Sequence, residues 1–193
     1  RATVHIAGMG LYELFINGQR IGNQVLAPAP TDYRKTILYN TYDVTPQLRK
    51  ENAIGVTLGN GRFYTMRQNY KPYKIPTFGY PKLRLNLIVE YMDGSKETIA
   101  TNTSWKLTTE GAIRSNNEYD GEEYDARKEL GNWTQSGYDD KSWIAAQRVS
   151  IPSGTLRAQI MPGMKVMDTL KPVSIQKLGD KYILDFGQNM AGW

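Results

Sequence analysis

The feature that most constrains this chain is the alternation of polar and apolar side chains in short runs that end at turn residues. The alternation is present at residues 2–6, 11–16 and 83–91. An Asn17-Gly18 dipeptide follows the second run, and both residues tolerate the positive φ that a type I′ hairpin turn requires. A period of two residues is that of a half-buried strand. The chain is therefore predicted to be all-β.

The composition agrees with many strands and many turns. The 193 residues include 18 Gly, 9 Pro and 13 Tyr, and 40% of them are hydrophobic, which is enough for a core. The absence of Cys excludes disulfide bonds and thiolate sites. The length is long for one small sandwich and short for two domains, so we expect one complete domain and part of another.

The remaining segments extend this pattern. Further strands are predicted at residues 36–44, 53–58, 96–101, 105–107, 173–175 and 182–186. Loops are expected at 25–34, 62–81 and 118–127, and a helical turn is expected at Thr45-Pro46 with Thr45 as its N-cap. Trp133 and Trp143 are expected to plug the sandwich edge. We predict a first domain at 1–149, and a linker with the first strands of a second β domain at 150–193.

Charge and hydropathy exclude several classes of partner. The net charge is +5, but the basic residues are interspersed with acidic ones and form no run of five. This favours ordinary solvated faces over nucleic-acid binding. No apolar run approaches the roughly 18 residues of a membrane span. Residues 1–10 alternate and lack the apolar centre of a signal peptide.

Several sequence blocks appear in a characteristic order. They lie at residues 11–22, 26–33, 39–45, 51–61 and 185–193, and the most specific is Asp120-Gly121-Glu122-Glu123-Tyr124-Asp125-Ala126-Arg127. Together they resemble the N-terminal region of bacterial α-L-rhamnosidases of glycoside hydrolase family 78. The resemblance implies a jelly-roll, galactose-binding-like β-sandwich with a partial second β domain at the C-terminus.

The resemblance also implies a function. In that family the catalytic acids lie in an (α/α)6 barrel that follows the β domains. The chain is then a non-catalytic accessory domain of a periplasmic or secreted enzyme that hydrolyses terminal non-reducing α-L-rhamnosides by inversion. Its expected partners are the downstream catalytic domain and rhamnosylated glycans. Two alternatives are an autonomous module that binds rhamnose or plant glycans, and a scaffold of another β-sandwich glycosidase.

Candidate catalytic groups are few. The acidic cluster of Asp120, Glu122, Glu123 and Asp125 could hold a pair of glycosidase carboxyl groups. A structural role is favoured, because Glu122 and Glu123 would point to opposite faces of a strand and Arg127 can neutralise its neighbours. The single His5 is expected to be a surface or packed strand residue. No catalytic residue is assigned.

Most candidate sugar-binding groups lie within residues 62–80, a segment that contains both aromatic rings and arginines. Sugars need an aromatic face and planar polar groups. The predicted binding residues are Asn60, Arg62, Tyr64, Tyr70, Tyr73, Asp120 and Glu122. The rings of this loop that could face a sugar also include Phe63 and Phe78. An equal alternative is that the loop packs on a neighbouring domain. Pro28-Ala29-Pro30 and Gly59-Asn60-Gly61-Arg62 lack a Trp that relatives commonly have, which weakens the stacking platform.

Metal binding through His and Cys is excluded by their number. Calcium prefers oxygen ligands on loops, and Asn60, Asn116, Asn117 and Asp120 could supply them. No other cofactor is expected.

Overall fold

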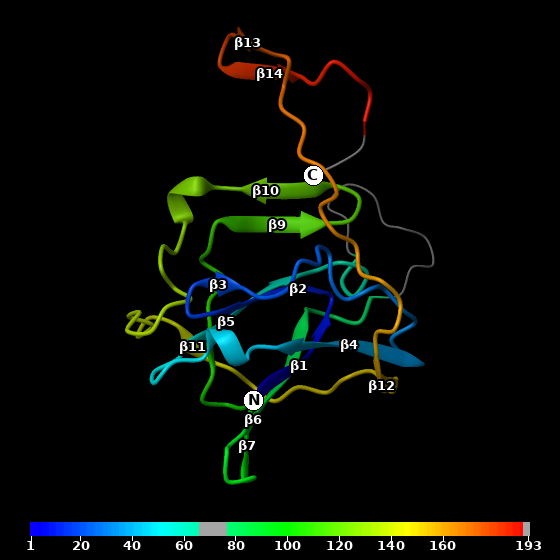
Figure 1. Ribbon diagram of the computed structural model, residues 1–193. Helices are drawn as coiled ribbons and strands as arrows, with labels where there is room; N and C mark the ends of the chain where they lie inside the picture. The colour runs from blue at the N-terminus through cyan, green and yellow to red at the C-terminus, as the bar shows by residue number, and fades with distance from the viewer. Residues whose placement is uncertain (66–76, 191–193) are drawn as a thin grey trace.

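The computed structural model describes residues 1–65 and 77–190, and it is almost entirely β-structure (Figure 1). The strands are β1 (Ala2–Met9), β2 (Leu11–Ile16), β3 (Gln19–Arg20), β4 (Thr36–Asp43), β5 (Ile54–Gly59), β6 (Lys82–Glu90), β7 (Lys96–Ala100), β8 (Lys106–Leu107), β9 (Ile113–Asn117), β10 (Gly121–Tyr124), β11 (Ile144–Ala145), β12 (Thr155–Ala158), β13 (Ser174–Leu178) and β14 (Lys181–Asp185). Two short 3-10 helices, η1 (Thr45–Gln47) and η2 (Ala126–Lys128), complete the regular structure. The predicted all-β class is confirmed.

Two sheets form the sandwich. The larger has the strand order β12-β4-β1-β6-β7 and the smaller has the order β3-β2-β5. β1 is antiparallel to both of its neighbours, so Val4 lies opposite Tyr42 on one side and Leu87 on the other. β2 pairs antiparallel with β5, with Leu14 opposite Val56. β9–β10, β8–β11 and β13–β14 form separate two-stranded pairs.

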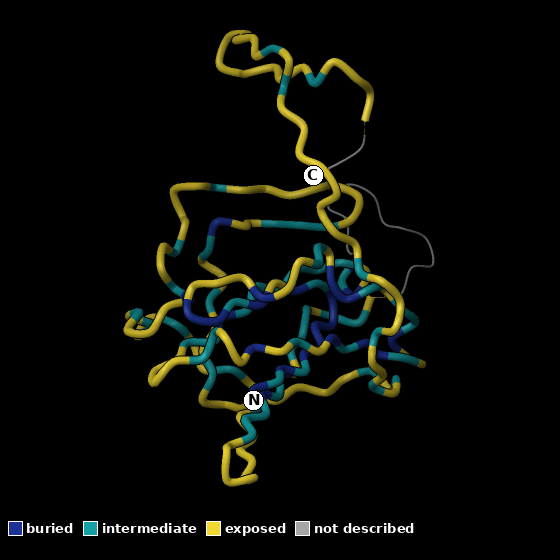
Figure 2. The backbone as a smooth tube through the Cα atoms, viewed as in Figure 1, coloured by how far each residue is buried: buried dark blue, intermediate teal, exposed yellow. Residues whose placement is uncertain are grey.

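The main core lies between the two sheets. Val4 and Ile6 of β1 are fully buried, as are Leu14 and Ile16 of β2, and Leu85 of β6 packs in the same cluster. These residues occupy alternate positions, so one face of each strand is apolar, as the alternation predicted. Burying each such side chain contributes about 1.5–3 kcal/mol. The core therefore explains why the alternating runs became the central strands (Figure 2).

A second apolar cluster contains Phe63, which has no exposed surface. Its ring meets Tyr33 edge-on at 5.0 Å and stacks with Phe78 at 5.5 Å between ring centroids. Phe63 and Phe78 were counted among the rings that could face a sugar or pack, and the structure shows that they pack with Tyr33. A phenyl ring has no polar group that gains from contact with water, so burial against Tyr33 is favoured.

The Asn17-Gly18 hairpin is confirmed. Both residues have positive φ, 51° and 82°, and Ile16 pairs with Gln19 across the turn. The Asn17 side chain accepts a hydrogen bond from the Ala53 N–H at 2.9 Å and donates one to the Gln47 carbonyl at 2.8 Å. The turn is thus fastened to the chain that leads into β5.

The short helix after β4 has a different cap from the one predicted. η1 begins at Thr45 and its N-cap is Val44, which makes no side-chain capping bond. The Thr45 hydroxyl instead donates to Asp43 Oδ1 at 2.6 Å, and its oxygen accepts the Ala2 N–H at 2.8 Å. The hydroxyl therefore ties β4 to the first residue of β1 rather than capping the helix.

The acidic stretch expected to be a loop contains a strand. β10 pairs antiparallel with β9, with Glu122 opposite Asn116 and Glu123 opposite Ser115. All four residues of β10 are exposed, so the strand has no buried face and no apolar period. Backbone hydrogen bonds to β9 hold it, and periodicity alone does not detect such a strand.

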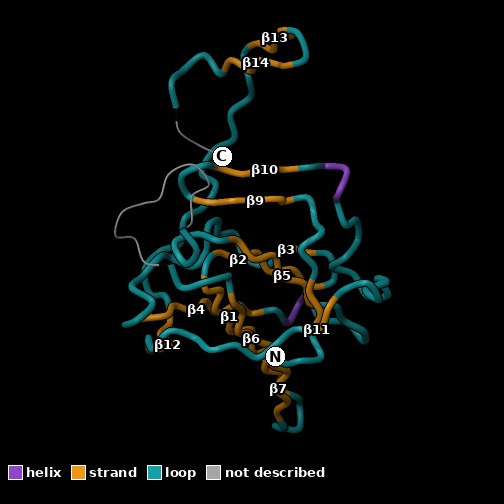
Figure 3. Tube along the Cα trace, turned by 180° about the vertical axis from the view of Figure 1, so that it is seen from behind, coloured by secondary structure: helices purple, strands orange, loops and turns teal. Residues whose placement is uncertain are grey.

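The C-terminal part of the chain adds one strand to the sandwich before it extends away from it. Residues 155–158, beyond the boundary predicted at Val149, form β12 and pair in parallel with β4 as the edge of the larger sheet. The β13–β14 hairpin follows, turning at Gly179 as predicted, and it projects away from the sandwich (Figures 1 and 3). The division into two domains stays a prediction.

The two tryptophans cover the outer side of the smaller sheet. The Trp133 ring meets Phe15 and Trp143 at 6.0 Å each. A Cβ at Gly55 would lie 2.6 Å from the Trp133 ring, so the indole rests directly on the backbone of β5.

Candidate functional site

The predicted polar residues gather where β5 ends and the β9–β10 hairpin turns. The Asn60 backbone N–H donates to Asn116 Oδ1 at 2.9 Å, and its side-chain amide donates to the Asn116 carbonyl at 2.6 Å. These bonds join residues 56 positions apart in the chain. The structure therefore brings together Asn60 and Asn116.

Arg62 follows Asn60 by two residues and forms an ion pair with Glu118 of the β9–β10 hairpin. Its Nε is 2.7 Å from Glu118 Oε1, with half of the arginine side chain exposed. An ion pair in such a solvated position contributes about 0–1 kcal/mol. A sugar that used the Arg62 Nε would have to compete with Glu118, a residue that the sequence prediction had not selected.

The hairpin tip is organised by Asn117. Its Oδ1 accepts the N–H groups of Tyr119 at 2.8 Å and Asp120 at 2.7 Å, and its Nδ2 donates to Asp120 Oδ2 at 3.0 Å. This is an Asx-type turn, in which a side chain replaces a backbone partner. Asp120 is therefore placed near Asn117, and the tip is held by its own polar groups.

These contacts bear on calcium. The amide oxygens of Asn116 and Asn117 already accept backbone N–H groups, and Asp120 is the one carboxylate of the predicted ligand set. Calcium favours several oxygens that are free to converge, usually with more than one carboxylate. No group of three or more acidic or His side chains that could hold a metal occurs within residues 1–65 and 77–190. Two of the predicted ligand oxygens are thus already hydrogen-bonded, and calcium binding stays a prediction.

Of the aromatic residues predicted to bind sugar, Tyr64 lies in the described chain, where it contacts Tyr80. Tyr64 and Tyr80 stack with ring centroids 5.0 Å apart and planes 29° apart. Desolvation raises the pKa of Tyr64, and its contact with Tyr80 raises it further. Tyr80 is 74% exposed and presents an aromatic face to solvent. Tyr70 and Tyr73 lie outside the described residues.

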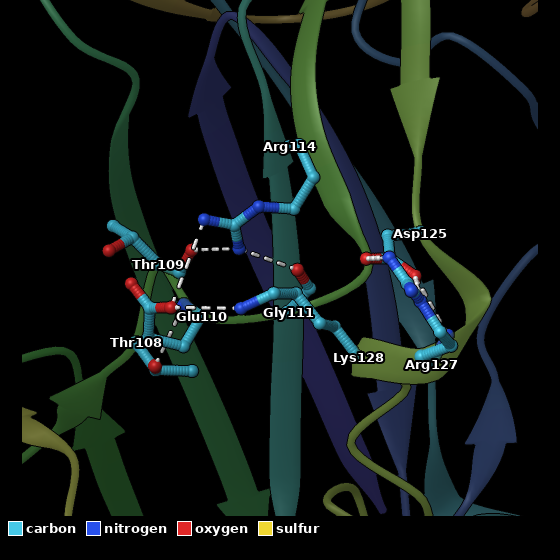
Figure 4. A network of polar contacts seen from close by, with 8 residues as sticks. All are labelled: Thr108, Thr109, Glu110, Gly111, Arg114, Asp125, Arg127 and Lys128. Carbon is cyan, nitrogen blue, oxygen red and sulfur yellow. Dashed lines mark hydrogen bonds and ion pairs between the residues drawn. The ribbon is translucent and has the colours of Figure 1, made fainter.

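The acidic cluster has partners of its own. Ser115 donates to Glu123 Oε2 at 3.0 Å, and Arg127 holds both oxygens of Asp125 at 2.8 Å through Nε and Nη2 (Figure 4). The Arg127 hydrogen bonds lower the pKa of Asp125. Glycosidase chemistry needs one carboxyl group with a raised pKa, facing a second across a sugar. Asp125 is shifted in the opposite direction.

A second polar network lies next to Asp125 and supports the start of β9. Arg114 donates through Nη1 to the carbonyls of Thr109 at 3.0 Å and Gly111 at 2.9 Å (Figure 4). Lys128 Nζ lies 3.5 Å from Glu110 Oε2. These bonds tie η2 to the chain before β9, which is a structural role.

One concave surface was not found from the sequence. An open groove of about 950 Å³ is bounded by β5, β6 and residues 144–151. Its lining comes from distant parts of the chain, and no linear motif marks it. The predicted residues Asn60, Arg62, Tyr64, Asp120 and Glu122 are not among those that line it.

Comparison with known proteins identifies the family. The family model described as the alpha-L-rhamnosidase N-terminal domain matches residues 1–168. The chain belongs to this family. An alpha-L-rhamnosidase of Formosa agariphila is 41% identical over 100% of this chain and 21% of that protein. One of Streptomyces avermitilis is 37% identical over 100% of this chain and 19% of that protein.

Solved structures agree with this assignment. The alpha-L-rhamnosidase from Dictyoglumus thermophilum superposes with a TM-score of 0.86 and 44% identity, covering 98% of this chain and 20% of that one. The Streptomyces avermitilis alpha-L-rhamnosidase complexed with L-rhamnose has a TM-score of 0.86 and 35% identity, with 98% and 18% covered. The chain thus spans about a fifth of the length of these relatives. In the described chain, no helix is long and apolar enough to cross a membrane.

Proposed function

We propose that this rhamnosidase N-terminal domain is a non-catalytic accessory domain, and that the polypeptide which carries it hydrolyses terminal non-reducing α-L-rhamnosides by inversion through downstream residues. The observation that carries the proposal is that two carboxylates of the acidic cluster are already bound by other side chains. Glu123 of the exposed strand β10 accepts a hydrogen bond from Ser115, and Asp125, which follows β10, is paired with Arg127. An inverting enzyme needs a carboxyl pair about 6.5–9.5 Å apart across a bound sugar. None of the four acidic residues lines either of the two hollows found among the described residues.

The role of the domain is then to position and stabilise the downstream catalytic part. The relatives are about five times as long as this chain, so most of their length lies in other parts of the polypeptide. Large exposed apolar residues after β12, such as Ile160 at 95% and Met167 at 89%, offer surface for contact with those parts. A periplasmic or secreted location for the parent enzyme is part of the proposal.

Activity measurements test the division of labour. We expect this chain alone to leave p-nitrophenyl α-L-rhamnopyranoside intact, whereas the longer polypeptide turns it over. In the longer polypeptide, the double variant Glu123→Gln with Asp125→Asn should keep wild-type kcat, because neither carboxylate touches the reacting sugar. Turnover by this chain, or loss of kcat by a hundredfold or more in the folded double variant, would place the chemistry here.

The second candidate is an autonomous rhamnose-binding or plant-glycan-binding module. It is favoured by the exposed Tyr80 ring beside Tyr64 and by the polar groups of Asn60 and Arg62. Titration of this chain with L-rhamnose, with and without calcium, separates the two. A saturable response that Asn60→Ala abolishes supports the module, and no response in the millimolar range excludes it. A scaffold of another glycosidase is not favoured, because the similar proteins above are rhamnosidases.

A further inference from the structure

The groove beside β6 continues onto the outer face of the larger sheet. A smaller hollow of about 250 Å³ lies there, lined by His5, Tyr39 and four residues that it shares with the groove. The shared residues are Ala7, Arg84, Asn86 and Leu156. The two hollows therefore adjoin, and Arg84 and Asn86 lie where they meet.

The charge of this surface is one-sided. The basic residues that line it are Lys82, Arg84, Lys106 and Arg148, and neither lining contains Asp or Glu. The whole chain has 24 basic and 19 acidic residues, so a lining without any acid departs from its surroundings. A concave surface lined by one sign of charge concentrates its field and attracts the opposite charge. The lining therefore favours an anionic ligand.

Of the four basic side chains, Arg84 and Arg148 are available to a ligand, whereas Lys106 and Lys82 already have partners. Lys106 Nζ lies 2.7 Å from Asp140 Oδ1, and Lys82 Nζ donates to the Tyr80 carbonyl and lies over the Phe63 ring. No carboxylate pairs with Arg84 or Arg148 anywhere in the described parts of the chain. A guanidinium binds a carboxylate or sulfate through two parallel N–H groups.

The groups around Arg84 suit a sugar. Asn86 lies opposite His5 across the β1–β6 ladder, and Arg84 lies opposite Ala7, so these side chains emerge on one face. His5 Nδ1 is 3.0 Å from Thr41 Oγ1, and its ring meets Tyr39 edge-on at 5.8 Å. Trp105 and Trp133 line the larger hollow. Amide and imidazole groups bind sugar hydroxyls, and aromatic rings cover the apolar face of a pyranose.

We propose that this surface, the Arg84 groove, binds an acidic oligosaccharide. A carboxylate or sulfate of one sugar unit binds the Arg84 guanidinium, and the adjoining sugar units lie along the groove toward Arg148. The proposal rests on the proposed function at one point: because a domain of a rhamnosidase encounters glycans, the anionic ligand is inferred to be a saccharide. The site is separate from Asn60 and Arg62, and the ligand class differs from neutral rhamnose.

Calorimetric and NMR titrations of this chain test the proposal. The probes are a galacturonic acid trisaccharide, a sulfated neutral trisaccharide, a neutral rhamnose disaccharide and a hexapeptide of glutamate. We expect at least one acidic saccharide to bind about tenfold or more tighter than the neutral one, and binding to weaken as ionic strength rises from about 0.01 M to about 0.15 M. Comparing the carboxylated and sulfated probes identifies the acidic group.

Matched variants locate the site. Arg84→Gln and Arg148→Gln should each weaken binding about fivefold, whereas Arg49→Gln removes the same charge from an exposed loop outside the groove and should leave affinity unchanged. Thermal melts check that each variant folds. Equal affinity for neutral and acidic saccharides, equal affinity for the peptide, or an equal loss in Arg49→Gln would overturn the proposal. Because binding is measured on this chain, its failure leaves the activity test of the accessory role untouched.

Discussion

The first two thirds of the chain and the rest, which includes the edge strand β12, use similar residues in opposite ways. Every buried apolar residue of the described chain lies between Ala2 and Ala112. Of residues 135–190, none is buried, although this part contains exposed Ile, Leu, Met, Val and Tyr side chains. Figure 2 shows the contrast between the dark sandwich interior and the exposed C-terminal hairpin. Apolar strands therefore form a core only where a second layer covers them.

The β13–β14 hairpin shows the reason. Ile175 lies opposite Leu184 on one face, and Gln176 lies opposite Ile183 on the other. Both faces thus carry apolar side chains, and no other described strand pairs with this hairpin. A single two-stranded hairpin is marginally stable in water. We therefore expect substitutions in the sandwich to cost far more stability than equivalent ones in the hairpin.

The largest expected effect is that of Phe63→Ala. Removing this fully buried ring leaves a cavity beside Tyr33 and Phe78, and should lower the free energy of unfolding by about 3–5 kcal/mol. The matched change in the hairpin, Tyr182→Ala, removes a side chain that is 62% exposed. It should lower the free energy of unfolding by about 0.5 kcal/mol or less. Urea unfolding of both variants measures the difference. Equal losses would show that the hairpin shares the core's stability.

A smaller contrast within the sandwich concerns two glycines with positive φ. Gly10 has a φ of 110°, and a Cβ there would press on the Gly59 carbonyl oxygen, so Gly10→Ala should cost about 2–3 kcal/mol. Gly94 has a φ of 82° with open space around it, so Gly94→Ala should cost about 1 kcal/mol from backbone strain alone. Differential scanning calorimetry can rank them. The reverse order would mean that the β1–β2 turn and the end of β5 separate more easily than the contact between Gly10 and Gly59 implies.

The smallest expected effect depends on pH. Hydrogen bonds from the Thr45 hydroxyl and N–H lower the pKa of Asp43 below its ordinary value of 3.8. A carboxyl group with a lowered folded-state pKa stabilises the fold fully above its unfolded pKa, and this contribution is lost as the pH falls through the folded value. Asp43→Asn should therefore flatten the decline of the melting temperature below about pH 4 while leaving the slope at neutral pH unchanged. A variant that declines as steeply as the wild type would assign the acid sensitivity to other carboxylates.

Much of the sandwich was predictable because its strands carry local signals. The alternation in residues 2–6, 11–16 and 83–91 predicted β1, β2 and β6, and Asn17-Gly18 predicted the first hairpin. β10 was not predicted, since its residues are polar and exposed on both faces. The parallel pairing of β12 with β4 joins residues more than a hundred positions apart, and no local pattern encodes such a pairing.

The candidate site divides in the same way. The sequence prediction selected Asn60, Asn116, Asn117 and Asp120 as polar residues on loops, and Asn60 and Asn116 do meet. The loop assignment was wrong for Asn116 and Asn117, which lie in β9. It did not identify Glu118 as the partner of Arg62, and it left Phe63 available to a sugar although the ring is buried. Residue type indicates what chemistry is possible. The partner that is already bound decides whether that chemistry remains available.

The sequence alone determined the all-β class, the positions of the central strands and the family, because alternation, turn dipeptides and motif order are local properties of the chain. The tertiary structure decided which groups are satisfied and which are free. Arg62 is paired with Glu118, whereas Arg84 has no carboxylate partner among the described residues and lies in a groove whose described lining contains no Asp or Glu. That difference arises from strands brought together across long sequence distances, and the ladder that places Arg84 beside Ala7 exists only in the folded sheet.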